Sequence, residues 1–259
     1  MKKSSKKIII VIAFFIIAVT EIVLVNTISR ATFTRETRKE LNLNAQLRTL
    51  EFVSSMNEQL TLVRQMVKTP SIVKYLSNPK DTAMEKEAFE NFLAYKNSFL
   101  SKSIFWISSK DLKFWSDMKY AYTVDPSLPT EYWYNMTMFE TEEYNFNINF
   151  NEALNMTMLW VNAVVRDDKG TPIGIAGTGV PIQYFVDSMY KGLNKKITMY
   201  LYNDKDEVVG SLDSSIIKDK LCIYDIFPYL KTIESKPTEI VFKQTLGGEY
   251  LLAPMTLVN

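Results

Sequence analysis

An apolar run near the amino terminus is the feature that most constrains this chain. The run extends from Ile8 to Val25 with Glu21 as its one charge, and four lysines among the first seven residues come before it. A helix needs about 20 mostly apolar residues to cross a hydrocarbon core, and this run approaches that length. The sequence therefore predicts a cytoplasmic amino terminus (1–7), a transmembrane helix (8–28) and an extracytoplasmic location for the rest of the chain. A cleaved signal peptide is the alternative, but the run is long and no clear small-residue cleavage site comes after it.

Composition excludes several classes of function. The 259 residues include no histidine and one cysteine, Cys222, which excludes a Ser/His/Asp triad, a His-ligated metal and an intrachain disulfide. The formal net charge of +1 provides no electrostatic basis for binding nucleic acid. We therefore expect a protein that is not an enzyme, with no cofactor, no metal site and no nucleic-acid partner.

A long amphipathic helix is expected after the apolar run. Apolar residues recur there at three- and four-residue steps, with one wider gap: Leu43, Leu47, Leu50, Val53, Leu60, Val63 and Val67. This pattern predicts one helix from Ser29 to Lys68 that ends before Pro70. We interpret residues 29–69 as a stalk whose first turns pair with a second copy of the chain, giving a homodimer, and whose later turns pack on a sheet.

Short runs rich in aromatic and β-branched residues predict strands after the helix. The expected strands are Ser103–Ser108, Lys113–Asp117, Tyr144–Phe150, Met158–Val165, Ile173–Val180 and Ile197–Asn203, with later ones near Val208 and at Glu249–Met255. Asp167–Gly170 is a hairpin signal, and Gln183–Gly192 is expected to be helical. One long helix followed by an antiparallel sheet is an α+β pattern.

Several motifs carry a family resemblance. A turn at Asp125-Pro126 leads to Trp133-Tyr134, SSKDLKF comes before it, and the strand pair LWVNAVVRDDKGTPIGIAGTGV comes after it. In this order the chain, over residues 29–259, resembles the double Cache sensor domains of bacterial chemoreceptors and sensor kinases. The resemblance implies two PAS-like antiparallel-sheet units, a membrane-distal ligand-binding unit (70–192) and a smaller membrane-proximal unit (193–259).

The resemblance also implies a role. We expect an extracytoplasmic domain in the cell membrane that senses small molecules for a transmembrane chemotaxis receptor, whose cytoplasmic signalling domain lies outside this sequence. The sensor of a histidine kinase or of a cyclic-dinucleotide enzyme is an alternative within the same fold. An anchored surface adhesion module is an alternative from a different class, and it predicts aromatic side chains exposed on a convex face.

The chain departs from the amino-acid-binding members of this family at two positions. Those members carry an arginine two places before the tryptophan, where this chain has Glu131, and an aspartate on the later strand, where it has Gly179 or Pro181. The departures disfavour an α-amino acid, because both charged anchors of such a ligand are missing. A carboxylate at Glu131 attracts a cation instead, and we expect it to form a site for an amine together with Trp133, Tyr134, Tyr144 and Trp160. A solvated loop carboxylate is the simpler interpretation of Glu131.

Two asparagines complete the predicted ligand site. Asn149 belongs to an alternating set (Asn145, Asn147, Asn149 and Asn151) that shares one face of a strand, and Asn162 shares a face with Trp160. Amide side chains both donate and accept hydrogen bonds, which suits a neutral polar ligand. Simple solvent exposure of the asparagines and a buried Trp160 are the alternatives. Trp133 and Tyr134 are expected in an extended segment, where neighbours point to opposite faces.

Overall fold

The computed structural model describes the backbone at residues 2–151, 156–193, 195, 197–203, 205–228, 241–245 and 248–252. Side chains are not described for residues 2–19, 30, 31, 34, 38, 150, 151, 241–245 and 248–252. The chain divides into two compact units. One unit contains the chain up to Thr49 together with strands β9 (Val241–Thr245) and β10 (Gly248–Leu252). The other begins at Leu50 and contains the remaining elements.

Helix α1 (Lys2–Met66) begins in the first unit and ends in the second. It covers the predicted helix and extends back through the apolar run, most of which lies in the residues whose side chains are not described. Among the residues whose side chains are described, no helix is both long enough and apolar enough to cross a membrane. In the same unit β9, which the sequence pattern did not indicate, pairs antiparallel with β10. Residues 253–255 of the last predicted strand lie outside the described residues.

An antiparallel sheet of six strands, in the order β3-β2-β1-β6-β5-β4, forms the centre of the second unit. Its strands are β1 (Phe105–Ser108), β2 (Lys113–Ser116), β3 (Lys119–Thr123), β4 (Tyr144–Asn151), β5 (Met156–Arg166) and β6 (Pro172–Pro181). Five of them match predicted strands within two residues, and the hairpin signal at Asp167–Gly170 joins β5 to β6. Strand β3, which was not predicted, is an edge strand with every residue exposed.

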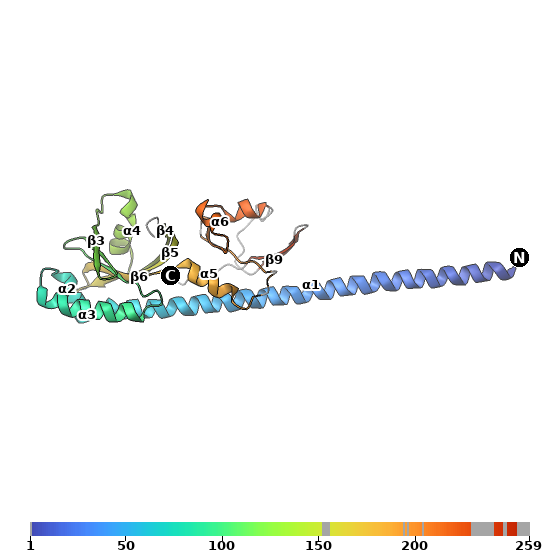
Figure 1. Cartoon of the computed structure of the whole chain (residues 1–259), viewed down its shortest axis with the longest axis horizontal. Coiled ribbons are helices and arrows are strands. Elements are labelled where there is room, and N and C mark those ends of the chain that lie inside the picture. Colours follow the sequence, from blue (N-terminus) through green and yellow to red (C-terminus); the bar gives the residue numbers. More distant parts are fainter. Residues whose placement is uncertain are drawn as a thin grey trace. The chain divides into compact units, whose positions relative to one another are not determined.

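Helices cover one face of this sheet. Helix α2 (Pro70–Ser77) starts with proline at a first-turn position, where the missing N–H costs nothing, and α3 (Thr82–Ser98) starts where Asp81 accepts hydrogen bonds from two backbone amides. Phe92 of α3 stacks on Trp106 of β1 at 4.0 Å between ring centroids, and both side chains are fully buried. Figure 1 shows α2 and α3 on one side of the sheet and α4 on the other.

The segment on the other side is helical. It consists of the 3-10 turn η1 (Pro129–Glu131), the short helix α4 (Tyr132–Asn135) and the π-helical turn η2 (Met136–Glu140). The prediction of an extended segment at Trp133 and Tyr134 was therefore wrong. We call residues 129–140 the cap.

Smaller elements come after the sheet in the second unit. Helix α5 (Ile182–Tyr190) matches the predicted helix, and its Phe185 packs on Phe52 of α1 at 4.6 Å between ring centroids. After it come β7 (Leu201–Tyr202), β8 (Val208–Gly210), α6 (Ser214–Lys218) and α7 (Ile223–Ile226). The strand predicted over Ile197–Asn203 is therefore reduced to two residues, which pair with β8. The predicted division into a distal and a proximal sensor unit stays a prediction.

Candidate functional site

The strand register decides which side chains lie beneath the cap, because residues paired across antiparallel strands point to the same side. Phe105 of β1 pairs with Gly177 of β6, Gly177 pairs with Asn162 of β5, and Asn162 pairs with Asn145 of β4. Phe105 belongs to one buried cluster with Tyr134 of the cap. This side of the sheet is therefore the one that the cap covers, and we call it the cap face.

An apolar and aromatic cluster fills the centre of the cap face. Its buried members come from the sheet, the cap and the loop between them: Phe105, Ile107, Val124, Tyr134, Met138 and Ile175. Leu112, Phe114, Trp133 and Trp160 pack against them and are partly exposed. Phe114 stacks on Phe105 at 5.6 Å and on Tyr122 at 5.0 Å between ring centroids. Trp133 packs against Phe114 in a T-shaped arrangement, with 6.1 Å between the ring centroids. Several ring faces and edges thus meet at a partly solvated surface.

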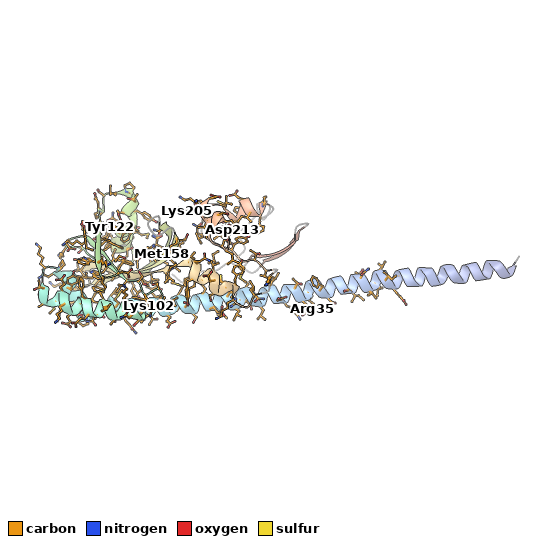
Figure 2. The ribbon with its side chains drawn as sticks, viewed as in Figure 1. Arg35, Lys102, Tyr122, Met158, Lys205 and Asp213 are labelled. Carbon is orange, nitrogen blue, oxygen red and sulfur yellow. The ribbon has the colours of Figure 1, made fainter. Side chains whose placement is uncertain are left out.

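Glu131 lies beside these rings and is held in one orientation. The indole Nε1 of Trp133 donates a hydrogen bond of 2.8 Å to its Oε2. Tyr122 lies on β3 (Figure 2), and its side chain is 39% exposed while its ring stacks on Phe114. This partial burial, together with the negative charge of Glu131, raises the pKa of its hydroxyl to about 12. The structure therefore brings Glu131, Trp133 and Tyr134 together with Phe114 and Tyr122, as a carboxylate at the rim of an aromatic cluster.

Trp160 occupies the other side of the same cluster. Its ring meets Phe105 edge to face at 5.6 Å, and its Nε1 donates a hydrogen bond of 2.8 Å to Oδ1 of the exposed Asn149. The ring lies directly over Gly179 of β6, where an added Cβ would be 2.6 Å from a ring carbon. A larger residue at position 179 would therefore displace this ring, which explains a glycine in the middle of a strand.

Asn162 serves a structural network rather than an open wall. Its Nδ2 donates to Oδ1 of Asn145 at 2.9 Å, and Nδ2 of Asn145 donates to the hydroxyls of Thr137 and Thr141 at 3.0 and 2.8 Å. Asn162 and Thr137 are buried, so an unpaired amide there would be costly. The network joins the π-helical turn η2 to strands β4 and β5.

Tyr144 does not lie with the other predicted site residues. It pairs with Ala163, Ala163 with Ala176, and Ala176 with Trp106, so Tyr144 shares the helix-covered face of the sheet. It lines an open groove of about 1170 Å³ together with Lys68 and residues of α2 and of the β5–β6 turn. Its expected place in the aromatic site was therefore wrong, because Tyr144 and Asn149 have opposite parity along β4.

Three solved structures of chemoreceptor sensory domains are similar to this chain. The sensory domain of the Campylobacter jejuni chemoreceptor Tlp3 with isoleucine bound has a TM-score of 0.60 at 14% identity, covering 85% of this chain and 88% of that one. The ligand-binding domain of the Pseudomonas aeruginosa PAO1 amino acid chemoreceptor PctC, in complex with GABA, gives 0.61 at 13% identity, covering 84% and 91%. The ligand-binding domain of the Pseudomonas fluorescens chemoreceptor CtaA, in complex with L-isoleucine, has a TM-score of 0.60 at 9% identity, covering 86% of this chain and 87% of that one.

This chain has the fold of a chemoreceptor ligand-binding domain. The fold expected from the resemblance is confirmed as an α+β sensor fold with a large antiparallel sheet. No family model matches the sequence, and no curated protein is significantly similar to it. At these identities the likeness concerns the fold, and the ligand has to be argued from this chain's own residues.

Sequence reasoning missed several residues of the cap face in this sensor fold. Phe114 and Tyr122 pair across β2 and β3, but β3 was not predicted, so the pairing was not visible. The alternation of Tyr120 and Tyr122 was the available signal. Thr137 gave no signal, because the helical conformation of the cap, which directs this side chain toward Asn145, was not predicted. Within the described part of the chain, no group of three or more acidic or cysteine side chains is placed to hold a metal ion.

Proposed function

We propose that this chain is the extracytoplasmic small-molecule-sensing domain of a transmembrane chemotaxis receptor and has no enzymatic activity. The observation that carries the proposal is the fold shared with three chemoreceptor ligand-binding domains over 84 to 86% of this chain. The cap and the aromatic cluster beneath it are the proposed ligand site. Its proposed contacts are Glu131, Trp133, Tyr134, Asn149 and Trp160, with Asn162 acting through Asn145.

The proposed ligand carries an ammonium or another organic cation. Aromatic faces attract a cation within about 6 Å, and the contribution grows from about 0.5 to 2 kcal/mol as water is removed. Glu131 adds a carboxylate whose orientation Trp133 already fixes, so little order has to be imposed on binding. The amino acids bound by Tlp3, PctC and CtaA share the ammonium group with amines, which is the part that Glu131 suits.

A neutral polar group is the second feature proposed for the ligand. Asn149 is exposed, and only its oxygen is used by Trp160, which leaves its amide hydrogens to face solvent. An amine that also carries a hydroxyl or amide group would thus be bound at both ends of the cluster. We expect this class to bind more tightly than simple alkylamines of the same length.

We further propose that residues 8–28 anchor the domain in the cell membrane and that the stalk, residues 29–69, forms a homodimer. Exposed apolar side chains along α1 support a partner for this helix, and they include Ile28, Phe33, Leu43, Leu47 and Leu50. Ligand binding would favour one of two arrangements of the helix pair, with a coupling of about 1 to 3 kcal/mol being ordinary for such a switch.

An adhesion module is the second candidate, because aromatic side chains are also exposed on the cap side. Phe139 is 71% exposed and Tyr132 56%. These residues belong to η2 and α4, so they lie on the cap that covers the proposed ligand site. A protein partner rather than a small molecule would then cover them.

Calorimetric titration of the full chain in a mild detergent tests the proposal. The panel contains ethanolamine, choline and putrescine, the amino acids isoleucine, alanine and GABA, succinate, and glucose. We expect binding of at least one amine, weakened at least tenfold by Glu131→Gln and unchanged by Glu87→Gln, an exposed carboxylate on α3. If the chain bound succinate, and Glu131→Gln left that affinity unchanged, the proposal of a cationic ligand would be contradicted. Failure of the whole panel would favour the adhesion module.

A further inference from the structure

The three residues directly after the cap are held at both ends. Thr141 closes η2, since its hydroxyl donates to the carbonyl of Met136 at 3.0 Å and accepts from Asn145 at 2.8 Å. Two positions later, Glu143 binds the last turn of α1 and the residue Lys68 just beyond it. A chain of only three residues, about 10 Å when extended, therefore separates the end of the cap at Glu140 from a contact with α1.

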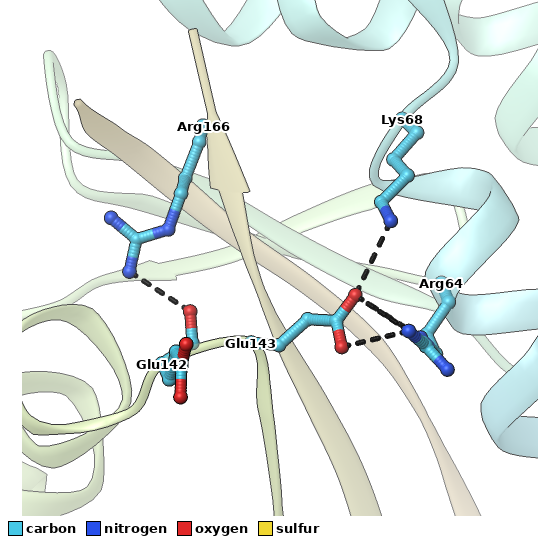
Figure 3. Close-up of polar contacts among 5 residues, drawn as sticks. All are labelled: Arg64, Lys68, Glu142, Glu143 and Arg166. Atoms are coloured by element: carbon cyan, nitrogen blue, oxygen red, sulfur yellow. Dashed lines mark hydrogen bonds and ion pairs between the residues drawn. The ribbon is translucent and has the colours of Figure 1, made fainter. Parts of the chain in front are cut away.

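The contact between Glu143 and α1 is multiple and directional. Nε and Nη2 of Arg64 donate to Oε1 of Glu143 at 3.1 and 3.0 Å, and Nη2 also lies 2.9 Å from Oε2. Nζ of Lys68 donates to the same Oε1 at 3.2 Å. Figure 3 shows the carboxylate between the two cations. We call Arg64, Lys68 and Glu143 the clasp. Partial burial by itself raises the pKa of the Glu143 carboxyl. The hydrogen bonds and positive charges of Arg64 and Lys68 have the larger combined effect, so the pKa is lowered.

Arg166 fixes the backbone between the cap and the clasp. Its Nη2 donates to the carbonyls of Thr141 and Glu142 at 3.4 and 3.0 Å, and its Nη1 donates to the carbonyl of Gly170 in the β5–β6 turn at 3.0 Å. The guanidinium is planar and its donors point in fixed directions, so these bonds set the path of the backbone as well as its position. Movement at the end of η2 is then passed on to Glu143 rather than absorbed in a loose loop.

The surroundings of the clasp leave room for it to rearrange. Side chains of Arg64, Lys68 and Glu143 are 47%, 67% and 37% exposed. Lys68 and Glu143 also line the open groove of about 1170 Å³, so a change of partner would not displace packed side chains. Exposed ion pairs contribute little to global stability. The clasp is thus strong enough to set a geometry and weak enough to open.

We propose that Glu143 is a positioning residue that couples the cap to the end of α1, so that cap movement on ligand binding reaches this helix through the clasp. The ligand part of this statement rests on the proposed function. The mechanical part does not, because it concerns contacts present without ligand. Glu142 provides a matched comparison, since it accepts from Arg166 through its backbone carbonyl, which a change of side chain leaves in place.

Hydrogen exchange of the full chain in detergent, without ligand, tests the coupling. The reporters at the end of α1 are the amides of Val67 and Lys68, which donate to Val63 and Gln65. Glu143→Gln is expected to raise the exchange of these amides and of η2 by about two- to fivefold, as suits the loss of an exposed ion pair. Glu142→Gln should leave both regions unchanged. Uniformly faster exchange in β5 and β6 as well would overturn the proposal, because it would indicate general destabilisation.

A second pair of variants separates coupling from local loosening. Thr141→Val removes the hydroxyl that closes η2 without touching the clasp, and we expect it to raise exchange at Val67 as well as in the cap. In the double variant Thr141→Val with Glu143→Gln, exchange at Val67 should rise no further than in Glu143→Gln alone. If Thr141→Val loosens only the cap, the coupling does not exist. A positive result here with no binding in the ligand panel would sustain the clasp and reject the proposed ligand.

Discussion

The two faces of the six-stranded sheet are built differently. On the helix-covered face, Trp106 is fully buried between Phe92 at 4.0 Å and Trp115 at 5.8 Å, with nearly parallel rings. On the cap face, Trp133 and Trp160 are partly exposed, and each donates its indole N–H to a polar side chain. Burial without exposed polar groups is typical of a core, whereas oriented polar groups beside partly exposed rings are typical of a binding surface. The core around Trp106 on the helix-covered face therefore holds the fold together, whereas the cap face carries the ligand site that we propose.

The largest expected effect is on the helix-covered face. Trp106→Ala should lower the free energy of unfolding by about 3 to 5 kcal/mol, because a fully buried aromatic ring leaves a cavity. Trp133→Ala on the cap face should cost clearly less, since part of its surface is already in water. Chemical denaturation of the full chain, followed by circular dichroism, measures both. Equal losses from the two variants would remove the distinction between the faces.

Two glycines of β6 give the next test, within the cap face. An added Cβ at Gly177 would lie 2.1 Å from the carbonyl oxygen of Val161, which is backbone, whereas at Gly179 the nearest atoms belong to the Trp160 side chain. Gly177→Ala should therefore cost about 1 to 3 kcal/mol of unfolding free energy by overpacking. Gly179→Ala should cost less, because the Trp160 ring can turn aside.

For ligand binding, we expect the order of the two variants to be reversed, with Gly179→Ala having the larger effect. Turning Trp160 breaks its hydrogen bond to Asn149, so Gly179→Ala should weaken binding of the cationic ligand more than its small effect on stability suggests. Titration of both variants with the amine that binds the wild-type chain measures this. A Gly179→Ala protein with unchanged affinity would exclude Trp160 from the site.

The long strands of the sheet could be predicted because each consists of a continuous apolar or alternating run. Strands β5 and β6 are buried over most of their length, and their hairpin signal at Asp167–Gly170 is local in sequence. The cap could not be predicted in the same way. Its three short elements are stabilised by contacts with Asn145 on the following strand and with Phe105, which is distant in sequence, rather than by helix-forming residues.

The candidate site was predicted in part for a related reason. Glu131, Trp133 and Trp160 were chosen for their chemistry, and the fold brings them to one cluster or its rim. Tyr144 was chosen for its ring alone, and the strand register places it on the opposite face. Residue type therefore indicated which side chains suit a cation, and alternation along β4 already separates Tyr144 from Asn149. Only the register between strands decides which residues of different strands meet.

The smallest effect compares two tyrosines, one associated with each face. Burial and then the charges of Glu85 and Asp111 raise the pKa of Tyr75 in α2 to about 12, while burial and then Glu131 raise that of Tyr122 to about 12. A folded-state pKa above the unfolded value of about 10 means that the folded chain keeps the proton longer. The associated stability is complete below about pH 10 and is lost as the pH rises from there toward 12.

Glu131→Gln should separate these two groups. It removes one cause of the raised pKa at Tyr122, so that this hydroxyl ionises at lower pH, although burial keeps its pKa above about 10. The pKa of Tyr75 should not change, because the charges that raise it are those of Glu85 and Asp111, and Glu131 is not among them. Ultraviolet difference absorbance of tyrosinate, with Tyr122→Phe as the reference for assignment, follows the two steps. If the Tyr122 step does not move, the Glu131 carboxylate does not act on this ring. The cation site would then lose the charge that distinguishes the cap face from the helix-covered face.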